Sequence, residues 1–196
     1  MVRPDPKAIA ADLHRYWPHY DPPSAAPPAS GQTQAKGGIR AFVQDAPKQV
    51  AYVSYAAAQG TMAMMMVMTP LVMSHSGHHL SAISVTVSIH VVGMFALSIF
   101  LGRLADRMGR KPLLWLGLII QAIGAVLVPL TSFYWIITLG LFLVGVGWSA
   151  VNVSSTTVLA DTTSAEERGR AVGANDALAG AWGILTPLTG GLVAEA

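Results

Sequence analysis

The sequence contains no cysteine, and only 11% of its 196 residues are charged. The lack of thiols excludes disulfide bonds and thiolate chemistry. A water-soluble domain carries about a quarter charged residues, so this low charge argues against a soluble globular protein. The formal net charge is only +2, which is too small to indicate a nucleic-acid partner.

Two long stretches contain no Asp, Glu, Lys or Arg. One runs from Gln49 to Leu101 and the other from Pro112 to Ala160. A helix needs about 20 apolar residues to cross the hydrocarbon core of a bilayer, so each stretch is long enough for two spans. We therefore predict an all-α integral membrane protein with about five transmembrane helices, at about 49–70, 80–102, 113–130, 134–158 and 171–193.

Residues 1–48 differ from the rest because they hold eight of the twelve prolines. A Pro-rich polar stretch cannot bury a core, so we predict a mostly disordered linker or tail, compatible with short helices at 7–17 and 39–43. The transmembrane domain then covers 49–196.

The basic residues predict the orientation of the chain in the membrane. All twelve Lys and Arg lie in the tail and in the segments 103–112 and 161–170, whereas 71–79 and 131–133 contain none. Basic loops stay on the cytoplasmic side of a membrane. We therefore predict a multi-pass protein of the cytoplasmic membrane with a cytoplasmic N-terminus.

The segment between the second and third predicted spans reads Gly-Arg-Leu-Ala-Asp-Arg-Met-Gly-Arg-Lys from residue 102 to residue 111. Gly102 would let helices approach closely, and Gly109 would permit a left-handed turn. The basic charge alone is explained by topology. The spacing, however, resembles the signature loop of the major facilitator superfamily, and it matches at Gly102, Asp106, Arg107, Gly109, Arg110 and Lys111. The segment from Asp161 to Arg168 and Arg170 is similar to that family's acidic-then-basic loop.

The resemblance implies a twelve-helix carrier whose two six-helix halves rock around a central cavity. Asp106 would then lie near the start of the helix at Ala171, where free N–H groups favour an anion. Arg110 would pair with Asp161. These contacts would form a latch that breaks as the cytoplasmic side opens, and an Asp106→Asn variant with unchanged transport and conformational equilibrium would argue against it.

Several features favour the C-terminal half of such a carrier, without its twelfth helix. The tail resembles the central cytoplasmic linker, and Leu141 stands where many N-terminal halves carry an Arg. Against this, the segment 187–191 is similar to the proline-glycine motif of proton-coupled drug exporters, although Trp182 and Thr186 stand where that motif has glycines. The remaining half is the expected partner.

Polar residues inside the spans are candidates for the cavity. His90 is an ionisable group near mid-bilayer, and it is either a proton-linked site or a neutral imidazole bonded to another helix. Asn152 shares a face with Ser149 and Thr156, which should look into the bundle or the cavity. On the second span the small residues Ser81, Ser84, Ser88 and Gly102 predict close helix packing at the two ends of their stripe.

The fifth predicted span carries one small-residue face formed by Asp176, Gly180, Gly183, Pro187 and Gly190. That face would let another backbone approach, and Pro187 would bend the helix. Asp176 is open to three interpretations: a hydrated structural acid, the partner of a cytoplasmic Arg, or a protonatable site.

The histidines His75, His78 and His79 have a spacing compatible with a transition metal, but a solvated loop is the simpler interpretation. The sequence shows no catalytic constellation, cofactor motif or phosphate-binding loop. We therefore predict a secondary-active carrier of a small solute, with protons as the expected coupling ion, and not an enzyme. Two alternatives stay open: a truncated or half-size fragment that needs a partner, and a membrane-embedded metal enzyme that uses the four histidines from His75 to His90.

Overall fold

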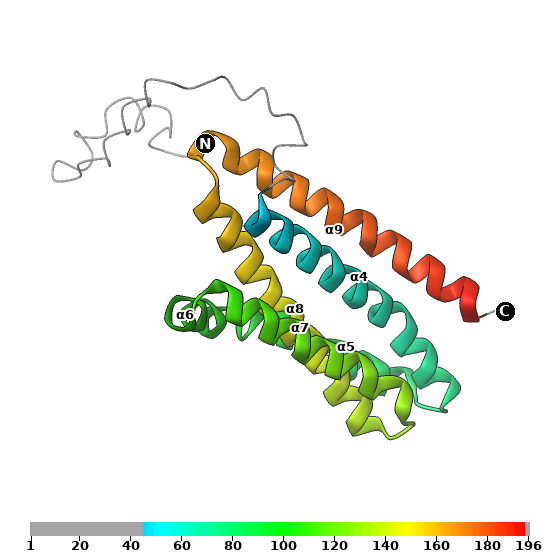
Figure 1. The fold of residues 1–196 in the computed structure, drawn as a ribbon. Coiled ribbons are helices and arrows are strands. Elements are labelled where there is room, and N and C mark those ends of the chain that lie inside the picture. Colours follow the sequence, from blue (N-terminus) through cyan, green and yellow to red (C-terminus); the bar gives the residue numbers. More distant parts are fainter. Residues whose placement is uncertain (1–44, 195–196) are drawn as a thin grey trace, which may run out of the picture. The chain divides into compact units, whose positions relative to one another are not determined.

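The computed structural model describes residues 45–194, which form helices joined by short turns (Figure 1). The predicted disordered tail lies almost entirely outside the described residues, as do its two short helices. The elements in chain order are α4 (Ala46–His75), α5 (Leu80–Phe95), α6 (Ser98–Met108), α7 (Arg110–Leu127), the 3₁₀ turn η1 (Val128–Leu130), α8 (Tyr134–Thr162) and α9 (Ala165–Ala194). The predicted all-α class is confirmed.

Four segments of the described chain are long and apolar enough to cross a membrane: Ala46–His75, Leu80–Met108, Arg110–Leu130 and Tyr134–Thr162. They correspond to the first four predicted spans. The helix of the fifth predicted span, α9, has 30 residues, but it is not among these four candidates. Its crossing of the membrane stays a prediction.

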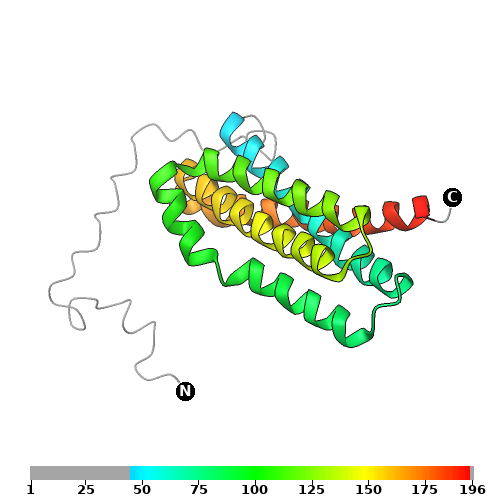
Figure 2. The same cartoon turned by 90° about the horizontal axis from the view of Figure 1, so that it is seen from below.

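Helix α8 lies at the centre of the bundle, in contact with α4, α5 and α7, and Figure 2 shows it between α5 and α7. Helix α9 packs mainly on α4, and the two run side by side from the same end of the bundle (Figure 1). The Tyr52 hydroxyl donates to the Ala171 carbonyl near the start of both helices, at 3.4 Å. Consecutive long segments therefore alternate in direction, as successive membrane crossings require.

Glycines bring α7 and α8 into backbone contact. A Cβ atom added to Gly147 of α8 would lie 2.6 Å from the Gly117 carbonyl oxygen and from the Gln121 nitrogen of α7. A Cβ atom added to Gly124 would meet the Gly140 carbonyl at 2.5 Å. Small residues at such positions let membrane helices approach closely. This is the tightest contact between helices in the described bundle.

The second predicted span is broken, which corrects the continuous helix expected over 80–102. Helix α5 ends at Phe95 and α6 starts at Ser98, with a turn at Ala96 and Leu97. The Ser98 hydroxyl donates to the Phe95 carbonyl at 2.7 Å, a local bond that competes with the helical pattern. Such a side-chain insertion is a known cause of helix kinks.

The observed boundaries differ from the predicted ones mostly at the helix ends that carry charges. Helix α8 continues to Thr162 rather than 158, and α9 starts at Ala165 rather than 171. Apolar length measures only the hydrocarbon thickness, whereas a helix can continue into the interface because its backbone bonds are internal. Pro70 lies inside α4, five residues before its end, and not at the end as expected.

Within residues 45–194 the serine stripe of the second span does not pack against another helix, which contradicts the close packing predicted for it. Ser81, Ser84 and Ser88 are exposed, and the hydroxyls of Ser84 and Ser88 donate to carbonyls of their own helix. The buried residues of α5 are instead Ile83, Thr86, His90 and Gly93. Helical angles assign residues to a face, but they do not say which face meets the neighbour.

Candidate functional site

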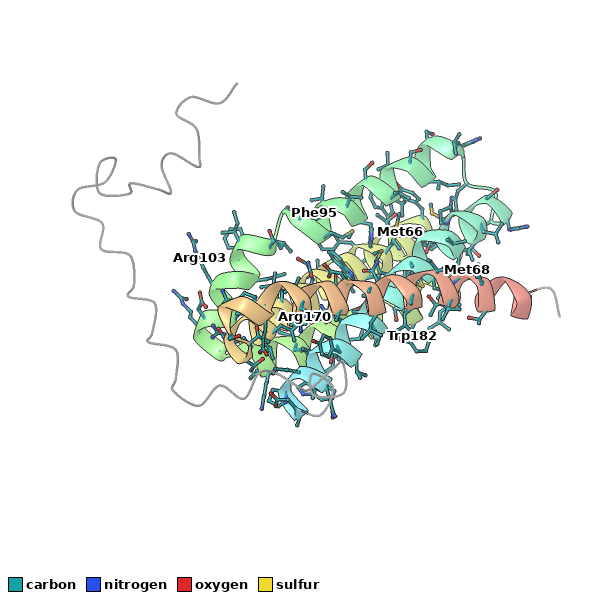
Figure 3. All side chains as sticks on the ribbon, turned by 90° about the horizontal axis from the view of Figure 1, so that it is seen from above. Met66, Met68, Phe95, Arg103, Arg170 and Trp182 are labelled. Carbon is teal, nitrogen blue, oxygen red and sulfur yellow. The ribbon has the colours of Figure 1, made fainter. Side chains whose placement is uncertain are left out.

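The described basic residues gather at one end of the bundle, which we call the basic end. It comprises the start of α4, the α6–α7 turn and the α8–α9 connection. Figure 3 labels Arg103 of α6 and Arg170 of α9 at this end. The remaining basic residues here are Lys48, Arg107, Arg110, Lys111 and Arg168. Their gathering fits the predicted topology, while the orientation of this end toward the cytoplasm stays a prediction.

Gly109 makes the turn between α6 and α7. Its φ of +90° lies in the region that favours glycine, and it caps the start of α7. The expected left-handed turn is therefore present. Gly102, in contrast, has no atom within 4 Å of an added Cβ, so the close helix approach expected there is wrong.

Arg110 and Asp161 form an ion pair across this end. Arg110 is the first residue of α7, and Asp161 is the last residue but one of α8. Arg110 Nε lies 2.6 Å from Asp161 Oδ2, although Nε–H does not point at the carboxylate and forms no hydrogen bond. The structure thus brings together the two residues that the family resemblance paired.

A second basic residue caps the end of α8. The Arg168 guanidinium donates to the Ala160 carbonyl at 3.1 Å. The last carbonyls of a helix have no partner within the helix, and they carry the negative end of its dipole. Arg168 from α9 and Arg110 from α7 thus compensate both these carbonyls and the Asp161 carboxylate.

The other residues of the signature loop point away from protein partners. Asp106, Arg107 and Lys111 are exposed, and none has an ion pair or hydrogen bond within residues 45–194. The predicted approach of Asp106 to the start of α9 is not seen as a polar contact, so it stays a prediction. Among the polar groups of the loop, only Arg110 is paired within residues 45–194, while Ala105 holds the segment through apolar packing.

His90 is fully buried between α5 and α8. Its Nδ1 lies 2.7 Å from the Leu141 carbonyl oxygen; since a carbonyl only accepts, Nδ1 carries the proton. Gly145 makes room for this contact, because a Cβ there would meet the His90 carbonyl at 2.6 Å. The placement favours a neutral imidazole that joins two helices.

Helix α9 turns a different stripe toward its neighbours than the one predicted. Ala171, Asn175 and Ala179 are buried, whereas Asp176 and Gly180 are exposed. Farther along, Gly183 and Gly190 do contact α4, at Gln59 and Met64. A larger residue also packs there: the Thr186 hydroxyl donates to the Gly60 carbonyl at 2.8 Å. The glycine at this contact lies on α4, which explains how Thr186 can stand where the family motif has glycine.

Helix α9 is continuous through Pro187. The predicted bend at that residue is untested and stays a prediction.

Three helices contribute aromatic rings to one side of the bundle. The ring centroids of Tyr55 (α4) and Phe95 (α5) each lie 6.4 Å from that of Trp148 (α8). The Trp148 indole N–H donates to Gln59 Oε1 at 2.8 Å, and Asn152 follows Trp148 by one helical turn. We call this surface, formed by Tyr55, Gln59, Phe95, Trp148 and Asn152, the aromatic face. Sequence reasoning found only Asn152.

A different surface is hollowed: an apolar groove of about 820 Å³ lies between α4, α9 and the end of α7. Ala57 lines it, and at 100° per residue Ala57 points about 160° away from Tyr55 on the same helix. The groove and the aromatic face are therefore on opposite sides of α4.

Two histidines near the turn between α4 and α5 contact backbone carbonyls. His75 Nδ1 contacts the Leu71 carbonyl at 2.9 Å, and His78 Nε2 contacts the Ser132 carbonyl at 3.1 Å. The part of the chain that the structure describes contains no group of three His, Cys, Asp or Glu side chains placed to hold a metal ion. Nothing in this geometry supports the metal-enzyme alternative.

A sequence model of the Major Facilitator Superfamily matches residues 51–196, which is most of the chain. The chain belongs to this superfamily. Its members are non-enzymatic carriers of the membrane, so the chain is a multi-pass membrane protein and not an enzyme.

Named relatives agree with this assignment. The riboflavin transporter RfnT of Brucella anthropi is 33% identical over 119 residues, covering 59% of this chain and 29% of RfnT. The MFS-type transporter YdeG of Bacillus subtilis is 30% identical over 184 residues, covering 91% of this chain and 40% of YdeG. The class B tetracycline resistance protein of Escherichia coli is 36% identical over 96 residues, covering 49% of this chain and 24% of that protein. The chain thus spans at most 40% of the length of these relatives.

Proposed function

We propose that this chain forms one half of a secondary-active carrier that moves a small solute by alternating access. The observation that carries the proposal is the Arg110–Asp161 ion pair, which fixes the signature loop at the basic end. Membership of the superfamily supports the same conclusion. The half is the C-terminal one, and its basic end faces the cytoplasm.

In this mechanism the signature loop acts as a latch. The Arg110–Asp161 pair holds the loop against the end of α8, and Asp106 offers its exposed carboxylate to a helix that approaches when the cytoplasmic side closes. Opening of that side separates Asp106 from this helix. Energy comes from an ion gradient, and we propose protons as the coupling ion.

Gradient-driven accumulation in proteoliposomes tests the proposal. Riboflavin and tetracycline, the solutes in the names of two relatives, serve as probes. We expect accumulation of at least one probe under a proton gradient, its collapse when a protonophore dissipates the gradient, and a changed rate in Asp161→Asn. Accumulation that ignores both the gradient and Asp161→Asn would contradict the proposal.

A second candidate is a half-size or truncated chain that transports only with a partner. The observation that favours it is the short coverage of the relatives, 29% of RfnT and 40% of YdeG. Accumulation that is absent with the chain alone and appears after co-reconstitution with the N-terminal half of YdeG would support it.

A further inference from the structure

The aromatic face combines rings and polar groups that the packing of the bundle does not require. Trp148 is almost buried, at 8% exposed, but Phe95 is 61% exposed and ends α5 directly before the helix break (Figure 3). Tyr55 is half-buried and its ring contacts Trp148, so that Trp148 lies between the rings of Tyr55 and Phe95. The rings of three helices thus form a continuous aromatic surface with an open edge at Phe95.

Polar groups border this surface. Gln59 uses its carbonyl oxygen to accept from the Trp148 indole, which leaves its amide N–H groups as donors. Asp176 is exposed on α9 two helical turns before Gly183, on the stripe whose Gly183 lies against Gln59 of α4. Within residues 45–194, the Tyr55 hydroxyl, the Asn152 amide and the Asp176 carboxylate have no hydrogen-bond partner.

These unpartnered polar groups indicate that water, and not lipid, contacts the aromatic face. An unsatisfied polar group facing lipid costs several kcal/mol, and this applies to the Tyr55 hydroxyl and the Asn152 amide on the apolar helices α4 and α8. The opposite side of α4 is the apolar groove, which suits lipid tails or another helix. The aromatic face therefore lines water, where a solute can reach it.

We propose that the aromatic face is the solute-binding surface of this half and that it binds flat, conjugated organic molecules. The exposed Phe95 ring offers a planar solute a surface for the offset or edge-to-face contact that aromatic rings prefer, and the Trp148 and Tyr55 rings extend this surface. Gln59 donates to acceptors on the rim of the solute, and Asn152 and Asp176 accept from its donors. This inference rests on the proposed function, because the bound molecule is a transported solute only if the chain is part of a carrier. Binding itself needs no ion gradient and can be measured separately.

A matched pair of phenylalanines makes the test sharp. Phe95 and Phe133 are equally exposed, at 61% and 59%, but Phe133 lies in the turn before α8 at the far end of the bundle. Neither ring is buried, so neither Phe95→Ala nor Phe133→Ala should disturb folding, which circular dichroism checks. Fluorescence anisotropy of riboflavin, a flat conjugated probe, is titrated against the detergent-purified full chain.

We expect saturable riboflavin binding that Phe95→Ala weakens about tenfold, consistent with the worth of one stacking contact, and that Phe133→Ala leaves unchanged. Tyr55→Phe, which keeps the ring and removes the hydroxyl, should weaken binding less than Phe95→Ala. Excess sorbitol or tetraethylammonium should not displace the probe. Absence of saturable binding to the folded chain, equal weakening by both alanine variants, or displacement by tetraethylammonium would overturn the proposal, the last because it would indicate an aliphatic cation site.

The outcomes separate this inference from the proposed function. Riboflavin binding that depends on Phe95, without gradient-driven transport by the chain alone or with its partner half, would leave the binding surface standing and refute the carrier mechanism. Gradient-driven transport in which Phe95→Ala changes neither riboflavin binding nor uptake would refute the binding surface alone.

Discussion

Arg110 and Asp161 each lie at a helix end where the dipole of their own helix is unfavourable for their charge. Exchanging the two charges should therefore stabilise the structure, although the attraction between them is kept. Arg110 is a cation at the start of α7, and Asp161 is an anion at the end of α8. Helix dipoles favour the opposite arrangement. The double variant Arg110→Asp with Asp161→Arg keeps the attraction between the two charges but reverses both dipole interactions.

The magnitude follows from the exposure of the two side chains, 35% for Arg110 and 50% for Asp161. Such exposure places each charge–dipole interaction near the low end of its range, about 0.3 kcal/mol. Reversing both charges turns two unfavourable terms into favourable ones, a total gain of about 1 kcal/mol. That gain shifts the population toward the described loop conformation by about fivefold.

Cysteine labelling can measure this shift, because the chain has no native cysteine. Thr156 is exposed on α8, close to the basic end, so Thr156→Cys reports access of water from that end. With a membrane-impermeant maleimide we expect the labelling rate to rise in Asp161→Asn and to fall below wild type, by about fivefold, in the double reversal. The double reversal should also unfold at a higher temperature.

A double reversal that labels at the wild-type rate and has wild-type stability would show that the dipole interactions are negligible and refute the reasoning. A double reversal that labels like Asp161→Asn would show that the identity of each charge matters, for example through an unseen partner of Arg110. Leu80→Cys serves as a control because Leu80 begins α5 at the end of the bundle opposite the basic end. Its labelling rate should not change in any variant.

Four further predictions concern packing and solvent. Gly147→Ala should destabilise the bundle by about 1–3 kcal/mol through overpacking. Gly180→Ala, where nothing lies within 4 Å of the added Cβ, should stabilise it by up to about 1 kcal/mol. Equal melting temperatures of the two variants in detergent would contradict the α7–α8 contact. His90→Ala should cost about 1–3 kcal/mol because it removes a buried hydrogen bond between α5 and α8. His90→Gln should keep the pH dependence of transport, and its loss would restore the proton-linked role. Asp106→Asn should change Thr156→Cys labelling but not the melting temperature, since Asp106 has no partner within the described chain. Finally, a water-soluble maleimide should label Gln59→Cys faster than Ala57→Cys, and the reverse order would place lipid on the aromatic face.

The sequence was sufficient for the features that depend on one segment at a time. Charge-free runs predicted the four apolar helices because hydrocarbon excludes charge over a fixed thickness. Gly109 was predicted as a turn residue because only its own φ matters. The pairing of Arg110 with Asp161 came from family resemblance, since their separation along the chain gives no local signal.

Features that depend on which helix lies opposite were not predictable from one sequence. The stripe of Ser84 and Ser88 and the face with His90 are equally valid stripes of one helix, and only the position of α8 decides which is buried. Likewise Asn175, not the neighbouring Asp176, faces the bundle. The aromatic face was missed because Tyr55, Phe95 and Trp148 belong to three helices, and each looks like ordinary packing bulk when taken alone.

The packing of α7 against α8 limits where a conformational change can take place. Backbone contact at Gly117, Gly124, Gly140 and Gly147 leaves no room for sliding, because packed interfaces do not deform continuously. The Arg110–Asp161 pair joins these same two helices, so breaking it alone opens no gap between them. Loss of the ion pair instead changes the position of the loop that the pair orients. The acidic residue of this loop, Asp106, is exposed and unpaired among the described residues. A latch built on this loop must therefore close against a surface beyond α7 and α8, and the ion pair serves to present Asp106 to that surface.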